Sequence, residues 1–425
     1  MADKTNNREI LVFSDRDGKG GPSFMGTLLA ERVRGKEIFS FSYTSEWIKK
    51  GDPQLVDPDL QYFQGPQYLN DEKPNFGIFL DSAPDRWGRL LMRRKEANEA
   101  RKEKRPERQL MESDYLLGVF DSYRMGALRF RDDPNGPFLN NLENNTIPPW
   151  SSIRELETIS LKLEEDDAQK DPEYTRWLEM LIAPGSSLGG SRPKAGVTDE
   201  KNNLWIAKFP GRHDITDTGA WEMVVHDLAI KAGMNIAEAS LEKFSGTHHT
   251  FLTKRFDRTG KEGRLHFASA MTMLGYSYGR DFHEGVSYLE LADFISTYGA
   301  SVVTDLEELW RRIVFSICVC NTDDHLRNHG FLLSDAGWRL SPAFDINPVE
   351  SGTGLSLNIS GDDNSLDLDL AKSVSGYFRL TDIKAAGIID QVKSSVRSWK
   401  KIAGRYGIPG SERETMESAF RKANE

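Results

Sequence analysis

Apolar residues recur at helical spacing between Leu306 and Cys318, which predicts a helix buried along one face. The repeating positions are Leu306, Leu309, Trp310, Ile313, Val314, Ile317 and Cys318. Thr304 and Glu307 have the spacing of a capping box and place the start of the helix near Thr304. The helix is therefore expected to deliver the chain to a run of polar residues at 321–328.

A β-hairpin is predicted directly after these polar residues. Two short apolar runs, 330–333 and 338–340, flank the polar turn 334–337. The second run leads through Pro342 to Phe344 and Asp345. The order is therefore helix, acidic loop, hairpin and second aspartate.

A second hairpin is predicted upstream, from the runs 194–197 and 204–209 around a polar turn. Alternation along the second run puts Lys208 on the same face as Leu204 and Ile206. A lysine on an apolar face favours an anionic partner, because an unpaired buried ammonium is costly. A lysine at a strand edge whose charge reaches solvent is the structural alternative.

The next elements are a helix and a strand. Trp221, Val224, Val225, Leu228 and Ala232 form an amphipathic pattern that Gly233 ends. On this helix Glu222 either pairs with Lys208 or is a surface charge. Residues 248–258 predict a strand that runs into a charged turn, and its adjacent histidines would point to opposite faces rather than share one metal ion.

The remaining chain indicates domain organisation. The N-terminal region is rich in short strands, such as 37–43, and residues 132–149 contain the turn formers of a linker or long loop. Several helical segments follow residue 360. The expected domains are 1–135, 150–258 and 259–425.

Composition narrows the possible functions. The formal net charge of −10 argues against nonspecific nucleic-acid binding by the whole surface, although residues 86–108 hold ten Lys or Arg against four Glu. Apolar runs are too short to span a bilayer, so an intracellular, cytoplasmic protein without membrane contact is expected. Cys318 and Cys320 indicate neither a disulfide scaffold nor a zinc site.

The polar loop has the chemistry of phosphoryl transfer. Asp323 and Asn328 are separated by four residues, and Asp345 follows the hairpin. A kinase needs a carboxylate to orient the attacking hydroxyl, and an amide or carboxylate oxygen and a second carboxylate to hold Mg²⁺. Solvated turn residues or a helix cap are the structural alternative for the adjacent residues Asp323 and Asp324.

A glycine-rich segment at 185–194 offers a place for phosphate. Backbone amides approach a phosphate most closely where Cβ atoms are absent. Its spacing is close to that of a P-loop, but Ser191 and Arg192 replace the expected Lys-Ser/Thr pair. A flexible connection is the structural alternative.

These motifs, in this order, resemble the HipA family of kinase-like toxins from bacterial toxin–antitoxin modules. The resemblance rests on 187–195, 206–210, 254–258, 321–328 and 342–345, with 76–89 and 125–130 nearer the N-terminus. It implies an α+β, bilobal protein-kinase-like fold with an additional N-terminal α+β subdomain and a helical C-lobe. There is no His-Arg before Asp323, and Phe344-Asp345-Ile346 stands where protein kinases have Asp-Phe-Gly.

The resemblance also implies residue roles for an ATP- and Mg²⁺-dependent serine/threonine kinase. Asp323 would be the catalytic carboxylate, and Asn328 and Asp345 would hold Mg²⁺. Ser187 would be autophosphorylated, with Ser186 as a neighbour that competes. Nucleotide would be bound by Gly189, Gly190, Ser191, Lys194, Lys208, Lys254, Phe256, His325, Asn328, Phe344 and Asp345, with Lys254 and Phe256 using their main chains to meet adenine.

The partners that the resemblance implies are a HipB-like antitoxin with a helix-turn-helix, operator DNA bound through that antitoxin, and a protein substrate such as glutamyl-tRNA synthetase. Two other functions remain open: a catalytically silent DNA-binding corepressor, and a metal-dependent nuclease that uses Asp323, Asp324, His325 and Asp345. Loss of all ATP binding would favour the first. Mg²⁺-dependent DNA cleavage without nucleotide would favour the second.

Overall fold

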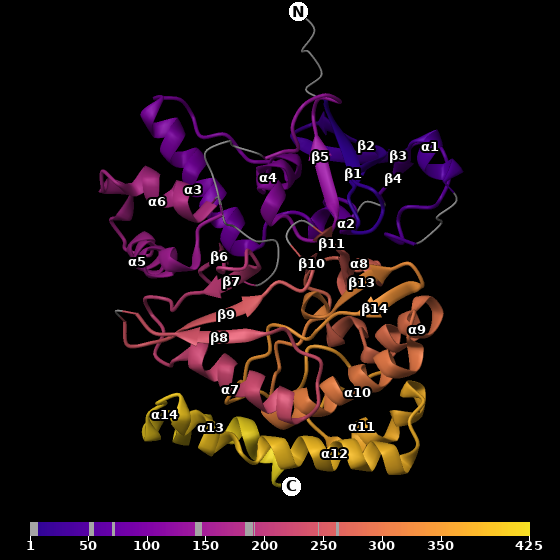
Figure 1. The fold of residues 1–425 in the computed structure, drawn as a ribbon, viewed down its shortest axis with the longest axis vertical. Helices are drawn as coiled ribbons and strands as arrows, with labels where there is room; N and C mark the ends of the chain where they lie inside the picture. Colours follow the sequence, from indigo (N-terminus) through magenta and orange to yellow (C-terminus); the bar gives the residue numbers. More distant parts are fainter. Residues whose placement is uncertain are drawn as a thin grey trace, which may run out of the picture. The chain divides into compact units, whose positions relative to one another are not determined.

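The structure is a computed structural model that describes residues 7–50, 55–69, 73–140, 147–182, 190, 192–244, 246–260 and 263–425. The chain divides into two compact units (Figure 1). The first contains Met1–Arg212 and Asp257–Ala268, and the second contains His213–Phe256 and Ser269–Glu425. The three domains expected from the sequence remain a prediction.

The first unit is built on an antiparallel sheet of five strands in the order β4-β3-β2-β1-β5. The strands are β1 (Arg8–Ser14), β2 (Ser23–Val33), β3 (Lys36–Tyr43), β4 (Gln67–Tyr68) and β5 (Leu128–Arg131). An aromatic core covers this sheet, because the Phe79 ring lies 5.6 Å from that of Phe41 and 6.0 Å from that of Phe130. Gly26 is required here, since a Cβ would come within 2.3 Å of the Ser42 carbonyl oxygen.

Helices and two hairpins complete this unit. The helices are α1 (Ser45–Lys49), α2 (Gly77–Asp81), α3 (Arg86–Lys102), α4 (Glu112–Gly118), η1 (Asp121–Tyr123), η2 (Trp150–Ser152), α5 (Ile153–Leu163), η3 (Ala168–Lys170) and α6 (Tyr174–Ile182). The hairpins are β6 (Lys194–Thr198) with β7 (Leu204–Lys208), and β10 (Arg258–Thr259) with β11 (Gly263–Arg264). The hairpin expected at 194–209 is therefore confirmed.

The second unit is mainly helical. It contains α7 (Thr218–Lys231), β8 (Ala239–Glu242), β9 (Thr250–Lys254), α8 (Ala270–Met273), η4 (Phe282–Glu284), α9 (Tyr288–Tyr298), α10 (Val302–Val319), η5 (Leu326–Asn328), β13 (Gly330–Ser334), β14 (Gly337–Leu340), α11 (Leu368–Ser373), η6 (Ser375–Phe378), α12 (Asp382–Val396), α13 (Trp399–Arg405), α14 (Gly410–Met416) and η7 (Glu417–Ala423). Strand β12 (His266–Ser269) ends where the chain enters this unit again.

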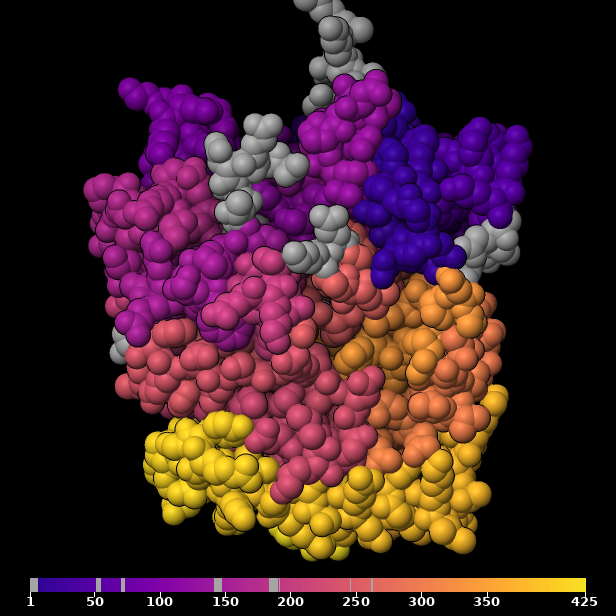
Figure 2. All heavy atoms as spheres, in the orientation of Figure 1, coloured from indigo at the N-terminus to yellow at the C-terminus, as the bar shows by residue number. Residues whose placement is uncertain are grey.

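Helix α10 is the centre of the second unit. It packs against α9 and α12, and the Trp310 indole Nε1 donates to the Ala371 carbonyl oxygen at 3.0 Å (Figure 1). The C-terminal segment, yellow in Figure 2, runs as a continuous layer along one edge of this unit. The periodicity of the sequence thus identified the helix correctly.

The start of α10 differs from the expectation. The helix begins at Val302, with Ser301 as its N-cap residue, so the capping box expected at Thr304 and Glu307 is wrong. Glu307 instead forms a 2.5 Å ion pair with Lys384 on α12. The Glu307 side chain thus contacts a neighbouring helix, and a local sequence pattern does not encode such a contact.

Among the described residues, no helix combines the length and the apolar character needed to cross a bilayer.

Candidate active site

The acidic loop begins with a sharp change of backbone direction at the end of α10. Cys320 caps the helix in the left-handed conformation, with φ of 54°. The Asn321 amide then donates back to the Ser316 carbonyl oxygen at 2.9 Å. The helix end therefore fixes where the loop starts. Both cysteines are buried free thiols.

The two adjacent aspartates of the loop lie in opposite environments. Asp323 is exposed, whereas Asp324 is 4% exposed. The carboxylate of Asp324 accepts from the Tyr288 hydroxyl at 2.6 Å and lies 3.0 Å from His329 Nε2. We call Tyr288, Ser316, Asp324 and His329 the Asp324 cluster; Ser316 Oγ donates to Asp324 at 3.3 Å. This cluster anchors the loop to α9 and α10 and leaves Asp323 exposed.

The electrostatics of Asp324 follow from these contacts. Burial raises the pKa of its carboxyl, but the charge and contact of His329 and the hydrogen bond from Tyr288 outweigh burial and hold that pKa below its ordinary value. Burial, and then the neighbouring Asp324 charge, raise the pKa of Tyr288 well above its ordinary value. The pair is therefore a neutral phenol that donates to a carboxylate.

Asn328 is oriented by the loop itself. Its Nδ2 donates to the Asp323 carbonyl oxygen at 2.9 Å, and the side chain is buried. Because the amide nitrogen is used inside the loop, the orientation of the side chain turns Oδ1 away from this contact. An amide oxygen is thus left within the loop that carries Asp323.

The segment that contains Asp345 is joined to the start of the same loop. Asn321 Oδ1 accepts a hydrogen bond from the backbone N–H of Asn347 at 3.2 Å. The backbone N–H of Val349 donates to the Cys320 carbonyl oxygen at 3.0 Å. Asp345 has a φ of 58°, a left-handed conformation that is uncommon for a residue other than glycine. Such conformations are concentrated at functional sites, where the surrounding contacts maintain them.

Two further candidate residues of the second unit also meet. The rings of Phe256 and Phe344 lie 5.4 Å apart at an angle of 37°. The Lys254 amide donates to the Glu238 carbonyl oxygen at 2.8 Å, and its ammonium lies 3.0 Å from the Glu238 carboxylate. The main-chain contact proposed for Lys254 would therefore use its carbonyl oxygen. His325 lies two positions after Asp323 in the loop, and its Nδ1 is buried without a hydrogen-bond partner among the described residues.

The candidate residues of the first unit lie on its β6–β7 hairpin. Lys194 and Lys208 are opposite each other in this hairpin, and both are buried. The Lys194 ammonium lies 2.8 Å from Asp85 Oδ2 and donates to the Gly190 carbonyl oxygen at 2.9 Å. Asp85 also caps α3, since its Oδ1 accepts from the Gly88 amide at 2.8 Å. Sequence reasoning missed this ion pair.

The remaining expectations from the sequence have different outcomes. Glu222 is buried, so the alternative of a surface charge is wrong, and its pairing with Lys208 remains a prediction. His249 contacts Asp217, with Nδ1 2.5 Å from Oδ2. Ser186, Ser187, Gly189 and Ser191 lie outside the described residues. Among the described residues, no group of three or more His, Cys, Asp and Glu side chains is arranged to hold a metal ion.

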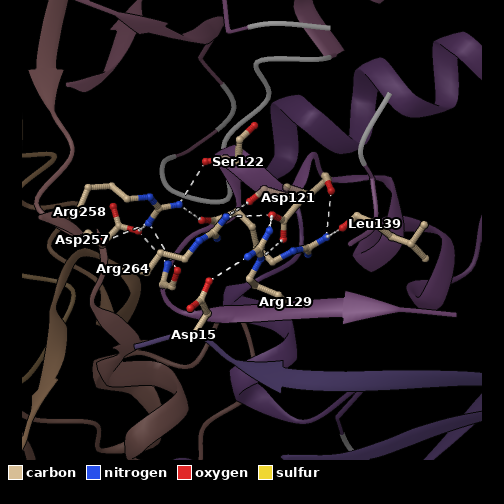
Figure 3. A network of polar contacts seen from close by, with 11 residues as sticks. Asp15, Asp121, Ser122, Arg129, Leu139, Asp257, Arg258 and Arg264 are labelled. Atoms are coloured by element: carbon tan, nitrogen blue, oxygen red, sulfur yellow. Dashed lines mark hydrogen bonds and ion pairs between the residues drawn. The ribbon is translucent and has the colours of Figure 1, made fainter. Parts of the chain in front are cut away.

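Buried charges in the first unit hold the 125–130 motif, through Arg129, to its neighbours. Asp121 accepts from Arg129 Nη2 at 2.6 Å and from Arg264 Nη2 at 3.0 Å, and Arg129 also lies 2.9 Å from Asp15 (Figure 3). We call Asp15, Asp121, Arg129 and Arg264 the Asp121 cluster. It fastens β11 to η1 and β5. Sequence reasoning assigned no role to this cluster.

Gly126 lies beside Asp257 and Arg258 in the same region, and the contacts there explain why this position is a glycine. The Gly126 amide donates to Asp257 Oδ2 at 2.8 Å, and Arg258, paired with that carboxylate, donates to the Arg124 carbonyl oxygen at 2.7 Å (Figure 3). Gly126 has a φ of 76°, and a Cβ there would lie 3.1 Å from the Phe267 nitrogen. The motifs at 125–130 and 254–258 therefore contact each other, and Asp257 and Arg258 hold the chain in place.

The fold and the loop together define a mixed α/β protein with a helix, acidic loop, hairpin and second aspartate in one unit. The family model of the HipA-like C-terminal domain matches residues 186–399. This match covers half of the chain, and the chain belongs to the HipA family. The resemblance seen in the sequence is thereby confirmed.

Known proteins agree with this assignment. The serine/threonine-protein kinase toxin HipA of Shewanella oneidensis is 24% identical over 234 residues, which are 48% of this chain and 53% of that protein. A protein of Haemophilus influenzae that is named as a kinase is 29% identical over 181 residues, 38% of this chain and 52% of that protein. The matches thus span about half the length of each of these relatives.

A solved structure shares the fold. HipA of Shewanella oneidensis, determined with HipB and its operator DNA, superposes with a TM-score of 0.66 at 17% identity and covers 97% of this chain and 95% of that chain. The mixed α/β architecture expected from the sequence is therefore confirmed. The bilobal, kinase-like layout belongs to the proposal below.

Proposed function

We propose that this chain is an ATP- and Mg²⁺-dependent serine/threonine protein kinase with the bilobal protein-kinase-like fold. The observation that carries the proposal is the joining of the 321–328 loop to the Asp345 segment through Asn321 and Asn347. Three oxygen-bearing side chains at kinase spacing thus belong to one locally fixed arrangement. Kinase chemistry needs little beyond positioning and charge stabilisation, which is the task that we assign to this arrangement.

Each of the three residues has a distinct role in the proposal. Asp323 orients a serine or threonine hydroxyl of the substrate and accepts its proton, a role that suits an exposed carboxylate. Asn328 Oδ1 and the Asp345 carboxylate would hold Mg²⁺, for which oxygen donors are the preferred ligands. Bound there, the ion would neutralise charge on the transferred phosphate.

Lys208 is proposed to bind the nucleotide phosphates. It is 8% exposed, and a buried ammonium requires anionic or polar partners. Lys194 is already paired with Asp85. We therefore expect Lys194 to shape the segment around Gly190. The role of Lys208 on the phosphates is proposed from its place in the 206–210 motif.

The test is phosphate transfer from labelled ATP by the purified protein. We expect Asp323→Asn to lower transfer by at least about 10²–10⁴-fold, the usual contribution of a positioned proton acceptor. Asp369→Asn, at an exposed position of α11, is the matched control and should retain activity. Retained transfer in Asp323→Asn would remove Asp323 from its role.

The same experiment separates the alternatives. Phosphopeptide analysis should find the label at Ser187, and label at Ser186 instead would correct the assigned residue. A wild-type protein that binds no ATP favours a silent corepressor. DNA cleavage that needs Mg²⁺ but no nucleotide favours a nuclease.

The relatives suggest partners for this chain. We propose that it binds a HipB-like antitoxin and, through it, operator DNA, as in the complex of the Shewanella protein. A component of translation, such as an aminoacyl-tRNA synthetase, is the proposed substrate. Co-expression with a small helix-turn-helix protein from the neighbouring reading frame, followed by size-exclusion chromatography, tests the antitoxin.

A further inference from the structure

A pocket of about 370 Å³ opens on the second unit, between the paired strands β8 and β9 and the end of α13. Helix α7 brings these elements together, because β8, β9 and α13 all pack against it (Figure 1). Small-molecule sites in proteins have volumes of about 300–1,000 Å³. The pocket is lined by Leu241, Lys243, His249, Arg405, Tyr406 and Gly407. None of these is among the residues proposed to bind nucleotide or Mg²⁺.

The lining carries two cationic side chains and no acidic one. Lys243 directly follows β8 and Arg405 is the last residue of α13, and both are exposed. Within the described part of the chain, neither side chain forms an ion pair or a hydrogen bond. On a protein with a formal net charge of −10, two such cations around one pocket favour an anionic ligand.

His249 adds a ring nitrogen whose orientation is fixed. Its Nδ1 lies 2.5 Å from Asp217 Oδ2, and its backbone N–H donates to Asp217 Oδ1 at 2.9 Å. Asp217 is itself held in place, since Oδ1 also accepts from the backbone N–H of Ala220 at the start of α7. Because Nδ1 donates to this carboxylate, Nε2 is the ring nitrogen left for a ligand. It donates to an anion when the ring is protonated.

Acceptors next to the pocket are already engaged. The Tyr406 hydroxyl donates to Asp227 Oδ2 at 2.8 Å. At the end of α13, the backbone N–H of Gly407 donates to the Gly404 carbonyl oxygen at 3.3 Å. The left-handed φ of 72° at Gly407 permits this helix ending. The carbonyl oxygen is thus satisfied within the protein, and the exposed charges of the lining are those of Lys243 and Arg405.

We propose that this pocket binds a small phosphate monoester. A guanidinium binds two phosphate oxygens at once in a fork geometry, and the Lys243 ammonium supplies a second charge. A monoester carries about −1.5 to −2 charges at neutral pH, which balance the charges of Lys243 and Arg405. A phosphodiester or a single carboxylate carries only one negative charge. The proposed site goes beyond the kinase function and does not depend on it.

Two isomeric phosphates provide the test. Ethyl phosphate is a monoester and dimethyl phosphate is a diester, so they have the same atoms but different charges. Isothermal titration calorimetry of the full chain compares their binding at constant ionic strength, because salt screens exposed charges. We expect ethyl phosphate to bind about 10-fold more tightly than dimethyl phosphate at about pH 7.5, above the second pKa of the monoester.

Variants assign the binding to the pocket. Arg405→Gln removes the charge and the fork, and it should weaken ethyl phosphate binding by about 10-fold or more. Lys243→Gln should weaken it by about 3-fold or more, because a lysine is a more flexible donor. The matched control is Lys372→Gln on α11, which removes an exposed lysine that does not line the pocket. It should retain wild-type affinity, and thermal unfolding monitored by circular dichroism verifies that each variant is folded.

Four results would overturn the proposal. One is a wild-type protein that does not bind ethyl phosphate at millimolar concentration. Another is binding of dimethyl phosphate at equal or higher affinity, which indicates a site for a diester. Wild-type affinity in both Arg405→Gln and Lys243→Gln places the ligand elsewhere, and an equal loss in Lys372→Gln indicates an effect of net charge alone. Phosphate transfer from labelled ATP is measured separately, so failure of this site leaves the proposed kinase function standing.

Discussion

Both units bury an aspartate, but they neutralise it in different ways. In the Asp121 cluster of the first unit, the carboxylate is paired with the guanidinium groups of Arg129 and Arg264. In the Asp324 cluster of the second unit, the carboxylate contacts a phenol and an imidazole. Arginine is a permanently charged donor with a fixed geometry, whereas a phenol donates a hydrogen bond without carrying charge.

This difference in the partners of the two aspartates agrees with the segment that each cluster stabilises. The Asp121 cluster fastens the β10–β11 hairpin to η1 and β5, so its partners are permanent charges with a fixed fork geometry. The Asp324 cluster supports a loop whose exposed Asp323 is proposed to act on substrate. An arginine there would compete for that carboxylate and for bound phosphate, whereas tyrosine and histidine hold Asp324 without adding a permanent charge.

Removal of Asp121 should have the largest effect. Asp121→Ala leaves Arg264, which is 6% exposed, without its carboxylate partner. Breaking a buried ion pair from one side costs about 3–5 kcal/mol of unfolding free energy. Chemical denaturation with circular dichroism measures this loss.

The control for this change is Asp132→Ala, which removes an exposed aspartate just beyond the end of β5. It should change stability by less than about 0.5 kcal/mol. A similar loss in both variants would show that the Asp121 cluster carries no special stabilisation.

The same comparison shows how far the sequence predicts the structure. Helix α10 and the hairpins β6–β7 and β13–β14 were predictable, because their apolar residues repeat with the periods of helix and strand. Asp323 and Asn328 stood out because their spacing is that of a protein-kinase catalytic loop, and Asp345 because it follows the hairpin. These features are encoded within short stretches of sequence.

Features that join distant stretches were not predictable. Asp85 and Lys194 pair across 109 positions, and Asp121 and Arg264 across 143. Asp324 also had no local sign of its role, since Tyr288 lies on α9, 36 positions away in the chain. Nothing in the pair Asp323-Asp324 indicates which carboxylate is buried.

Exchange of Asp324 should have a smaller effect than loss of Asp121. Asp324→Asn keeps one acceptor but presents an amide to Tyr288 or His329, and we expect a loss of about 1–3 kcal/mol. Asp323→Asn, the same exchange at the exposed neighbour, should leave stability nearly unchanged and remove phosphate transfer. If Asp323→Asn also destabilises the protein, the separation of the two roles is wrong.

The effect of Asp324 should depend on pH in a defined direction. Its folded pKa lies below the ordinary value of 3.8, so its charge stabilises the folded state above about pH 4, and this contribution is lost as the pH falls through the folded value. The stability difference between wild type and Asp324→Asn should therefore be constant near neutral pH and shrink below pH 4. A difference that grows with acid would contradict the lowered pKa.

Tyr288→Phe should give the smallest effect. The exchange removes only the hydroxyl that donates to Asp324 at 2.6 Å, while His329 and Ser316 still contact the carboxylate. The ring contact with His329, at 5.7 Å between centroids, is kept. We expect a loss of about 1 kcal/mol of unfolding free energy, the net value of one hydrogen bond.

The matched control is Tyr298→Phe on the same helix α9, where the side chain is 44% exposed and the exchange should be neutral. Loss of the Tyr288 hydroxyl should also raise the pKa of Asp324 toward its ordinary value, because that hydrogen bond favours the charged carboxylate. The acid limb of the stability curve would then begin at a higher pH than in the wild type. An unchanged acid limb would mean that His329 alone sets the charge of Asp324, and the cluster would then resemble the ion-paired Asp121 cluster more closely than its contacts indicate.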